Sequence, residues 1–111
     1  MFEGCENLTS FSSKLPSLIY GGSMFDGCKN LTSFTSELPS LTHGSNMFSK
    51  CNLTSFTADL SSLTRGGGMF SNCNTLDTVT IKLRNLESAN SMFKNCGNLK
   101  NLNLEYYDYA P

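Results

Sequence analysis

The chain contains no tryptophan, a single histidine and only three prolines among its 111 residues. Charged residues make up only 15% of it, and the formal net charge is -1. Proteins that bind nucleic acid or anionic membranes through charge carry a concentrated basic patch, so this composition argues against both classes. No apolar run approaches the roughly 18 residues of a membrane span, and no basic-then-apolar export signal opens the chain.

What the chain does contain is one unit of about 23 residues, repeated almost five times. A Met-Phe pair opens each unit, at Met1, Met24, Met47, Met69 and Met92. A cysteine follows each pair, and these cysteines recur at intervals of 23, 23, 22 and 23 residues. A fixed period in this range indicates a solenoid, because one such unit cannot bury its apolar face alone and must stack on its neighbours.

The five units divide the chain into a single repeat domain with the segments 1–23, 24–46, 47–68, 69–91 and 92–111. Met1 is in phase with the repeated methionine, so the pattern begins without a polar capping unit ahead of it. Solenoids need such units to cover their end surfaces. We therefore expect the sequence to be an excerpt of a longer array.

The spacing of apolar residues changes within a unit and predicts two kinds of local structure. Near the start of a unit the spacing is i, i+1, i+4 and i+7, as in Met24, Phe25, Cys28 and Leu31. This spacing is typical of one face of a short helix. Residues 32–36 then surround Phe34 with Thr and Ser, which favours a short strand. Pro39 marks a corner, and stacked units would place these strands in a parallel ladder with rungs ~4.8 Å apart.

The unit Met-Phe-x-x-Cys-x-x-Leu-x-x-Phe/Val, followed by Leu-Pro or Leu, resembles the BspA-type leucine-rich repeats. The resemblance runs from Met1 to about Tyr109. It implies an α/β solenoid, a leucine-rich-repeat-like stack of about five coils that each hold a short helix and short parallel strands. That family comprises surface and adhesion proteins, so the resemblance implies a cell-surface or extracellular location.

The chain departs from the family at one strand position. A second aliphatic residue is usual there, but the first three units hold Ser13, Ser36 and Ala58 instead. Ile81 and Leu104 restore the aliphatic residue in the last two units. The fold prediction is unaffected, but the departure weakens the transfer of a specific binding surface from the family.

The five cysteines raise the question of a metal or disulfide site. Zinc ligands come in pairs two to four residues apart, and no two cysteines here are closer than 22 residues. Stacked units would bring their Cα atoms to ~5 Å, within disulfide range, but the side chains would point the same way. We interpret them as buried free cysteines that act as small hydrophobes. We expect no metal and no cofactor.

A catalytic thiol would need a neighbouring base, and His43 is the one histidine. It lies in the linker between two units. Its counterparts in the other units differ from it chemically and are Tyr20, Arg65 and Ser88. We therefore predict no catalytic residues and no enzymatic activity.

The outward face of the predicted strands is the candidate binding face. The large apolar residue at the centre of each strand is expected to point inward, so that its two neighbours point outward. The two outward columns are Ser10, Ser33, Ser55, Thr78 and Asn101, and Ser12, Thr35, Thr57, Thr80 and Asn103. Three interpretations stay open: a solvated β-surface, a platform for a glycan or protein partner, and an array like that of ice-binding β-solenoids.

A charged column is predicted beside the two outward columns. It consists of Lys14, Glu37, Asp59, Lys82 and Glu105. Three of its neighbouring contacts join opposite charges, while Glu37 and Asp59 carry like charges. This mixture favours a solubilising role over a recognition role.

The C-terminal segment 105–111 holds an aromatic cluster of Tyr106, Tyr107 and Tyr109. By register, Tyr106 and Tyr109 take the places of Leu15 and Leu18, so we expect them to cover the last rung. Tyrosine suits such a cap, because its ring can face the core while its hydroxyl reaches water. A partner-binding patch is the alternative interpretation.

Together these observations predict a non-enzymatic surface or adhesion module that binds a protein or carbohydrate partner along its strand face. Two alternatives remain. The solenoid could be a purely structural spacer, or its Ser/Thr columns could recognise ice or a glycan. Flanking repeats or subunits are the expected partners of the first coil.

Overall fold

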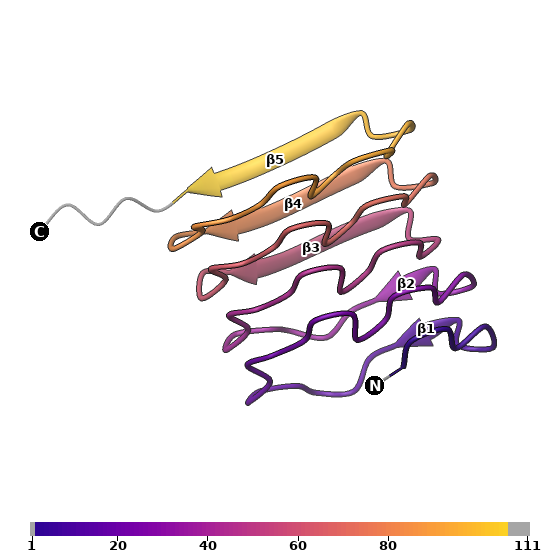
Figure 1. Cartoon of the computed structure of the whole chain (residues 1–111), viewed down its shortest axis with the longest axis horizontal. Coiled ribbons are helices and arrows are strands. Elements are labelled where there is room, and N and C mark those ends of the chain that lie inside the picture. The colour runs from indigo at the N-terminus through magenta and orange to yellow at the C-terminus, as the bar shows by residue number, and fades with distance from the viewer. Residues whose placement is uncertain (1, 107–111) are drawn as a thin grey trace, which may run out of the picture.

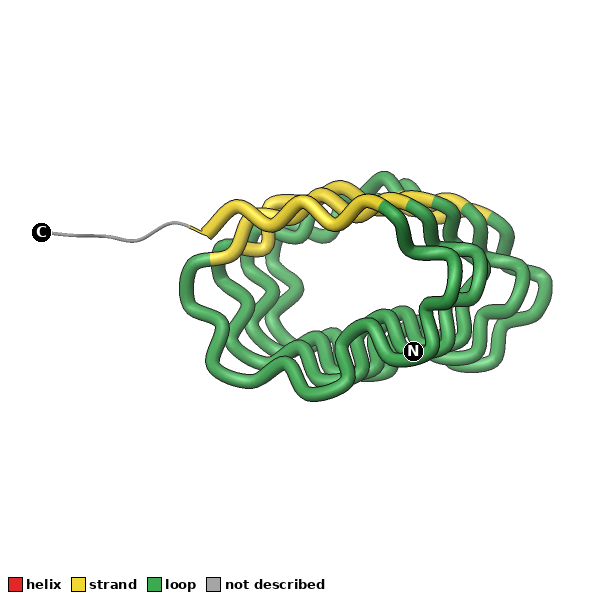
Figure 2. The backbone as a smooth tube through the Cα atoms, turned by 90° about the horizontal axis from the view of Figure 1, so that it is seen from above, coloured by secondary structure: helices red, strands yellow, loops and turns green. Residues whose placement is uncertain are grey.

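The computed structural model describes residues 2–106, and this part of the chain forms five parallel strands (Figure 1). The strands are β1 (Ser10–Phe11), β2 (Ser33–Phe34), β3 (Ser55–Leu60), β4 (Thr78–Leu83) and β5 (Asn101–Tyr106). Each strand lies on one long side of a flattened coil, and turns form the opposite side (Figure 2). We number the coils 1 to 5 by the segments that form them: 2–23, 24–46, 47–68, 69–91 and 92–106. The predicted solenoid of parallel strands is confirmed.

The register of the ladder is the one that the 23-residue period predicts. β1 pairs with β2, and β3, β4 and β5 form a second sheet in that order. Phe56 pairs with Val79, which in turn pairs with Leu102, so the central apolar residues lie in one row. On the opposite side of the coils, single-residue parallel bridges join the four linker residues Tyr20, His43, Arg65 and Ser88. Their predicted equivalence is therefore confirmed.

The predicted short helix is wrong, because the described residues contain no helix. Its place is taken by a series of tight turns whose amide groups alternate between two partners. The Cys28 N–H donates to Phe25 within the coil, whereas the Phe25 N–H donates to the Met47 carbonyl of the next coil at 2.9 Å. A helix would need consecutive amides to bond within the segment. Here every second amide donates to the next coil instead, so a helical run of hydrogen bonds does not form.

These turns contain two left-handed backbone positions in each complete coil. One precedes the cysteine and is held by Gly4, Gly27, Lys50, Asn72 and Asn95. The other precedes the Met-Phe pair and is held by Ser23, Asn46, Gly68 and Ser91. Glycine and asparagine tolerate this conformation, which explains why they recur between the apolar positions. The φ angle of Lys50 is 63°, and lysine is a poor choice for it.

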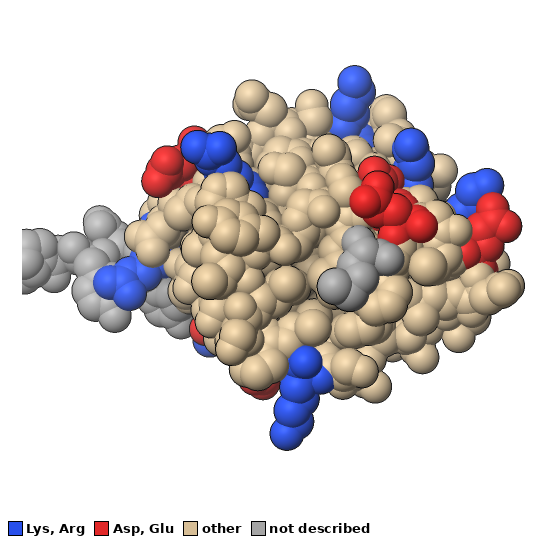
Figure 3. Space-filling view, turned by 60° about the horizontal axis from the view of Figure 1, so that its bottom comes forward, with Lys and Arg blue, Asp and Glu red and all other residues tan. Residues whose placement is uncertain are grey.

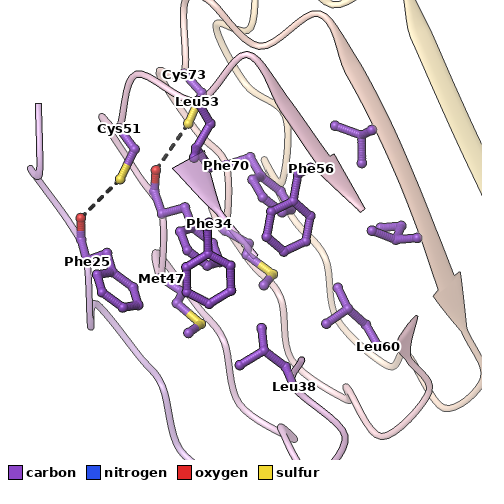
Figure 4. Close-up of a cluster of buried hydrophobic side chains, with 14 of the residues drawn as sticks. Phe25, Phe34, Leu38, Met47, Cys51, Leu53, Phe56, Leu60, Phe70 and Cys73 are labelled. Carbon is purple, nitrogen blue, oxygen red and sulfur yellow. Dashed lines mark hydrogen bonds between the residues drawn. The ribbon is translucent and has the colours of Figure 1, made fainter. Parts of the chain in front are cut away.

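Two columns of phenylalanine rings fill the core (Figure 4). The rings of the Met-Phe pairs stack from coil to coil at 5.4–5.6 Å, in the order Phe2, Phe25, Phe48, Phe70 and Phe93. The strand phenylalanines form the second column and meet the first edge-on, as where Phe34 lies 4.8 Å from Phe48. Such offset and edge contacts are the favoured geometries of aromatic pairs. Stacking therefore supplies the core that a single unit lacks.

Strand length differs between the two sheets, and the residues at the strand ends account for it. β1 and β2 have two residues each, whereas β3, β4 and β5 have six. The buried Ser36 hydroxyl donates a hydrogen bond to the Ser13 carbonyl, which competes with the regular ladder. Pro16 and Pro39 follow the same segments and have no N–H to donate. The later coils have neither feature.

Candidate binding face

The structure places the two predicted outward columns on one face of the stack. Ser10 pairs with Ser33 in the first sheet. In the second sheet, Ser55, Thr78 and Asn101 form one row, and Thr57, Thr80 and Asn103 form the other. Ser12 and Thr35 lie just beyond β1 and β2 and are exposed. The face is thus a regular array of small polar side chains along the coil axis.

Two of these side chains donate a hydrogen bond to the residue of the same column in the preceding coil. Asn103 Nδ2 donates to Thr80 Oγ1 at 3.3 Å, and Asn101 Nδ2 donates to Thr78 Oγ1 at 3.4 Å. Among the described residues, no such bond joins Ser55 to Thr78 or Thr57 to Thr80. Within residues 2–106, the hydroxyls of Ser55 and Thr57 therefore have no side-chain partner in the next coil of their column.

A groove opens beside these columns where the two sheets separate. It has a volume of about 550 Å³, and its walls include Thr35, Thr57 and Thr80 from one polar column. Ser36 and Ala58 also line it, at the strand position that Ile81 and Leu104 fill in the later coils. Small side chains at this position leave the space that larger aliphatic residues would occupy.

The groove continues towards coil 1, and members of the charged column line it along its length. A second hollow of about 490 Å³ shares Thr35, Ser36, Glu37 and Pro39 with the first. Lys14 lines one end of the combined groove, and Lys82 lines the other. The like-charged Glu37 and Asp59 lie between them. The combined groove brings hydroxyl, carboxylate and ammonium groups together.

Sequence reasoning found both columns but missed the groove. The small residues Ser13, Ser36 and Ala58, at a position that is aliphatic in the later coils, were the signal for a groove. Whether they open one depends on how neighbouring coils separate, which the sequence does not give. Elsewhere the surface carries little charge. Figure 3 brings the coil 1 end forward and shows a mostly uncharged face with a few charged side chains, some alone and some beside a side chain of opposite charge.

His43 lies away from this face, on the opposite side of the coils. Its Nδ1 is 2.7 Å from Thr42 Oγ1, and its ring lies 4.8 Å from the exposed Tyr20 ring. No cysteine accompanies it, since the cysteines lie in the core. The structure therefore does not bring a thiol and an imidazole together.

All five cysteines are free thiols, and they form one column along the core. Each thiol from Cys28 onwards donates a hydrogen bond to a phenylalanine carbonyl in the preceding coil, as where Cys51 meets Phe25 at 3.2 Å (Figure 4). Burial raises the pKa of Cys73 to about 12 and also raises the pKa of Cys51 strongly. Both thiols are therefore protonated at neutral pH, as a donor must be.

Tyr106 ends β5, where it pairs with Leu83 in the predicted register, and 60% of its surface is exposed. Tyr107 and Tyr109 lie outside the described residues. Within residues 2–106, no three His, Cys, Asp or Glu side chains are placed to hold a metal ion. The same part of the chain has no helix long and apolar enough to cross a membrane.

Comparison with known protein families gives one match over nearly the whole chain. The model of the BspA type leucine rich repeat region matches residues 1–107 with six copies, one more than the Met-Phe pairs suggest. Neither the curated proteins nor the solved structures contain a match.

Proposed function

The chain belongs to the BspA-type leucine-rich repeat family, and from this premise we propose that it is a non-enzymatic adhesion-type module that docks a protein or glycan partner on its strand face. The family makes it a repeat module of the kind used for protein interaction or adhesion. The partner and the docking surface belong to our proposal.

One observation carries this proposal: the groove lies along the same face as the polar columns. Glycans and peptides offer hydroxyl, amide and charged groups at intervals, and a solenoid offers matching groups at each rung. Thr35, Thr57 and Thr80 supply hydroxyl groups at successive rungs of the groove wall. Glu37 and Asp59 add acceptors, and Lys82 adds a donor.

Each of these contacts is weak by itself, because the groups are exposed and bond to water in the free protein. Binding strength would come from several rungs acting together. It would increase further if several modules engaged one surface, since linked sites raise the effective concentration.

The experiment is a lysine scan of this face, read out on glycan and peptide arrays. In the test variant, Thr57→Lys and Thr80→Lys place two long cations in the groove. The matched control places two lysines on the turn side, with Ser45→Lys and Asn90→Lys. Asn90 is exposed, as Thr57 is, and Ser45 is partly buried, as Thr80 is. We expect the wild-type chain and the control to bind the same array members and the groove variant to lose them.

Three outcomes would contradict the proposal. If the wild-type chain binds no array member, a structural spacer explains the chain better. If both variants bind as the wild-type chain does, the partner does not dock on the strand face. If thermal hysteresis appears in dilute solution, the polar columns act on ice. Only the Thr78–Thr80 rung has threonine in both columns, so we expect no hysteresis.

A further inference from the structure

The sheet is interrupted between β2 and β3, in the interior of the stack. β2 ends at Phe34, whereas its neighbour β3 runs on to Leu60, and the two strands belong to different sheets (Figure 1). The register continues across the interruption, because the Phe34 ring lies 6.0 Å from the Phe56 ring. The angle between these rings is 22°, compared with 8° between Phe34 and Phe11. Coils 2 and 3 therefore part here without losing their alignment.

The opening is confined to the strand side of the coils. On the turn side, the Gly27 N–H of coil 2 donates to the Ser49 carbonyl of coil 3 at 2.9 Å. On the strand side, no backbone hydrogen bond joins residues 35–38 to β3 in the described part of the chain. Coils 2 and 3 are thus closed on one side and open on the other.

The open side of β3 is a strand edge within the groove. β3 pairs with β4 from Ser55 to Leu60, so its other side, towards coil 2, has no ladder. Extended peptides bind such edges through main-chain hydrogen bonds and gain specificity from their alternate side chains. A glycan has no matching row of amide donors and carbonyl acceptors, so this edge favours a peptide.

The walls of the groove fit a short extended segment. Residues 35–39 line one side of it, and Thr57, Ala58 and Asp59 of β3 line the other. Extended residues rise ~3.3 Å each, so a wall of this length accommodates about four or five residues of a peptide. Ala58 and Pro39 add apolar surface, which suits small apolar side chains of the occupant.

Two carboxylates face each other across the groove. Glu37 follows Phe34 by three residues, as Asp59 follows Phe56, and both carboxylates are exposed. Like charges directly opposite each other destabilise a strand pair, which favours the division of the sheet at this step.

A basic side chain of an occupant would remove this repulsion. Within residues 2–106, Glu37 forms no ion pair. The Asp59 carboxylate accepts the Ser61 N–H at 3.0 Å, which holds it at the groove wall. Lys14 and Lys82 lie one coil further out on either side, so the centre of the groove is its negative part.

We propose that an extended peptide binds in this groove, pairs with the free edge of β3 and places one lysine or arginine side chain between Glu37 and Asp59. A small polar residue two positions away lies beside Thr35 and Thr57, and the residue between them faces Ala58. This inference rests on the proposed docking function and names the chemistry of the partner. Coils 2, 3 and 4 supply the walls, so further coils at either end of the stack would leave the site unchanged.

Fluorescence anisotropy of the full chain with a labelled synthetic peptide tests the charge contact. The probe is Gly-Thr-Val-Arg-Val-Thr-Gly, and a peptide with glutamate in place of arginine should bind roughly ten-fold more weakly. Glu37→Gln should weaken binding of the arginine peptide roughly three- to five-fold. Glu105→Gln is the control, because Glu105 belongs to the same charged column but lines neither hollow, and it should leave binding unchanged.

Two methylated peptides test the pairing with β3. Alternate residues of an extended strand direct their N–H groups to opposite sides. One peptide is therefore N-methylated at both valines and the other at both threonines, so that each lacks the donors of one side. One of the two should bind roughly ten-fold more weakly than the unmethylated peptide, and the other should bind as the unmethylated peptide does.

The proposal is overturned if the arginine and glutamate peptides bind alike, if Glu37→Gln and Glu105→Gln have the same effect, or if the two methylated peptides bind alike. It is also overturned if no peptide binds. The array experiment then decides the docking function separately, because a glycan that the wild-type chain binds and the groove variant loses would leave that function standing.

Discussion

The Sγ atom of Cys73 donates a hydrogen bond to the carbonyl oxygen of Phe48, one coil earlier, at 3.1 Å. The same carbonyl accepts the Cys51 N–H of its own coil at 3.1 Å. One carbonyl thus ties its own turn and the next coil together. The contact recurs at each coil boundary, which gives the repeated cysteine a structural role beyond that of a small hydrophobe.

Cys51 and Cys73 should resist modification by an aromatic disulfide reagent at pH 8 while the protein is folded. The thiolate is the reactive form, and burial of both thiols raises their pKa and blocks access to them. Cys5 is only partly buried and should react first. Peptide mapping by mass spectrometry over a time course measures each rate, with the unfolded chain as the control. Equal rates for Cys5 and Cys73 in the folded protein would contradict this prediction.

Stability should fall as the pH rises from about 9 towards about 12. The Cys73 thiol has an ordinary pKa of 9.0 and a pKa of about 12 in the fold. Between these values the unfolded chain loses the proton and the folded chain keeps it, so ionisation favours unfolding. Each such thiol lowers the free energy of unfolding by up to about 1.4 kcal/mol per pH unit in this window.

Urea unfolding at several pH values between 8 and 11 measures this slope. Tyrosine and lysine also titrate in this range, so the informative comparison is with Cys73→Val. Valine cannot ionise, and the variant should show a shallower slope whatever its stability at pH 8. An unchanged slope would show that Cys73 titrates normally in the fold.

Lys50→Gly should stabilise the protein by about 1 kcal/mol. Lys50 has a φ of 63°, a conformation that costs an L-residue about 1–2 kcal/mol and costs glycine nothing, while glycine gives back part of the gain through chain entropy. Thermal and urea unfolding measure the difference. Lys94→Gly is the control, because Lys94 is exposed at an ordinary φ and its replacement should destabilise. A stabilising Lys94→Gly would show that lost charge, not backbone strain, explains both results.

Phe48→Ala should cost about 3–5 kcal/mol, because loss of a fully buried ring leaves a cavity in one phenylalanine column and removes its contact with the other. Phe93 lies at the end of its column and is only partly buried, so Phe93→Ala should cost roughly half as much. Urea unfolding of both variants gives the ratio. Equal costs would mean that the last coil is covered as well as the middle ones.

The sequence predicted the repeat, the inward row of central strand residues and both outward columns, because each follows from the period and from two-residue alternation. The prediction was wrong at residues 24–31, where apolar residues at helical spacing lie in a series of turns. Apolar residues at these intervals face the core in either structure. The deciding factor is the partner of the Phe25 N–H, which lies at Met47 in the next coil.

The sequence by itself determined that this chain is a stack of coils in register, because no single unit can bury its own phenylalanines and every unit repeats the same positions. Only the tertiary structure decided where the sheet divides and how Ser36 and Ala58 open a groove there. Those features arise between coils, where the distance and direction of one chain segment relative to another select each hydrogen bond. The spacing of residues within a unit does not determine these contacts between coils.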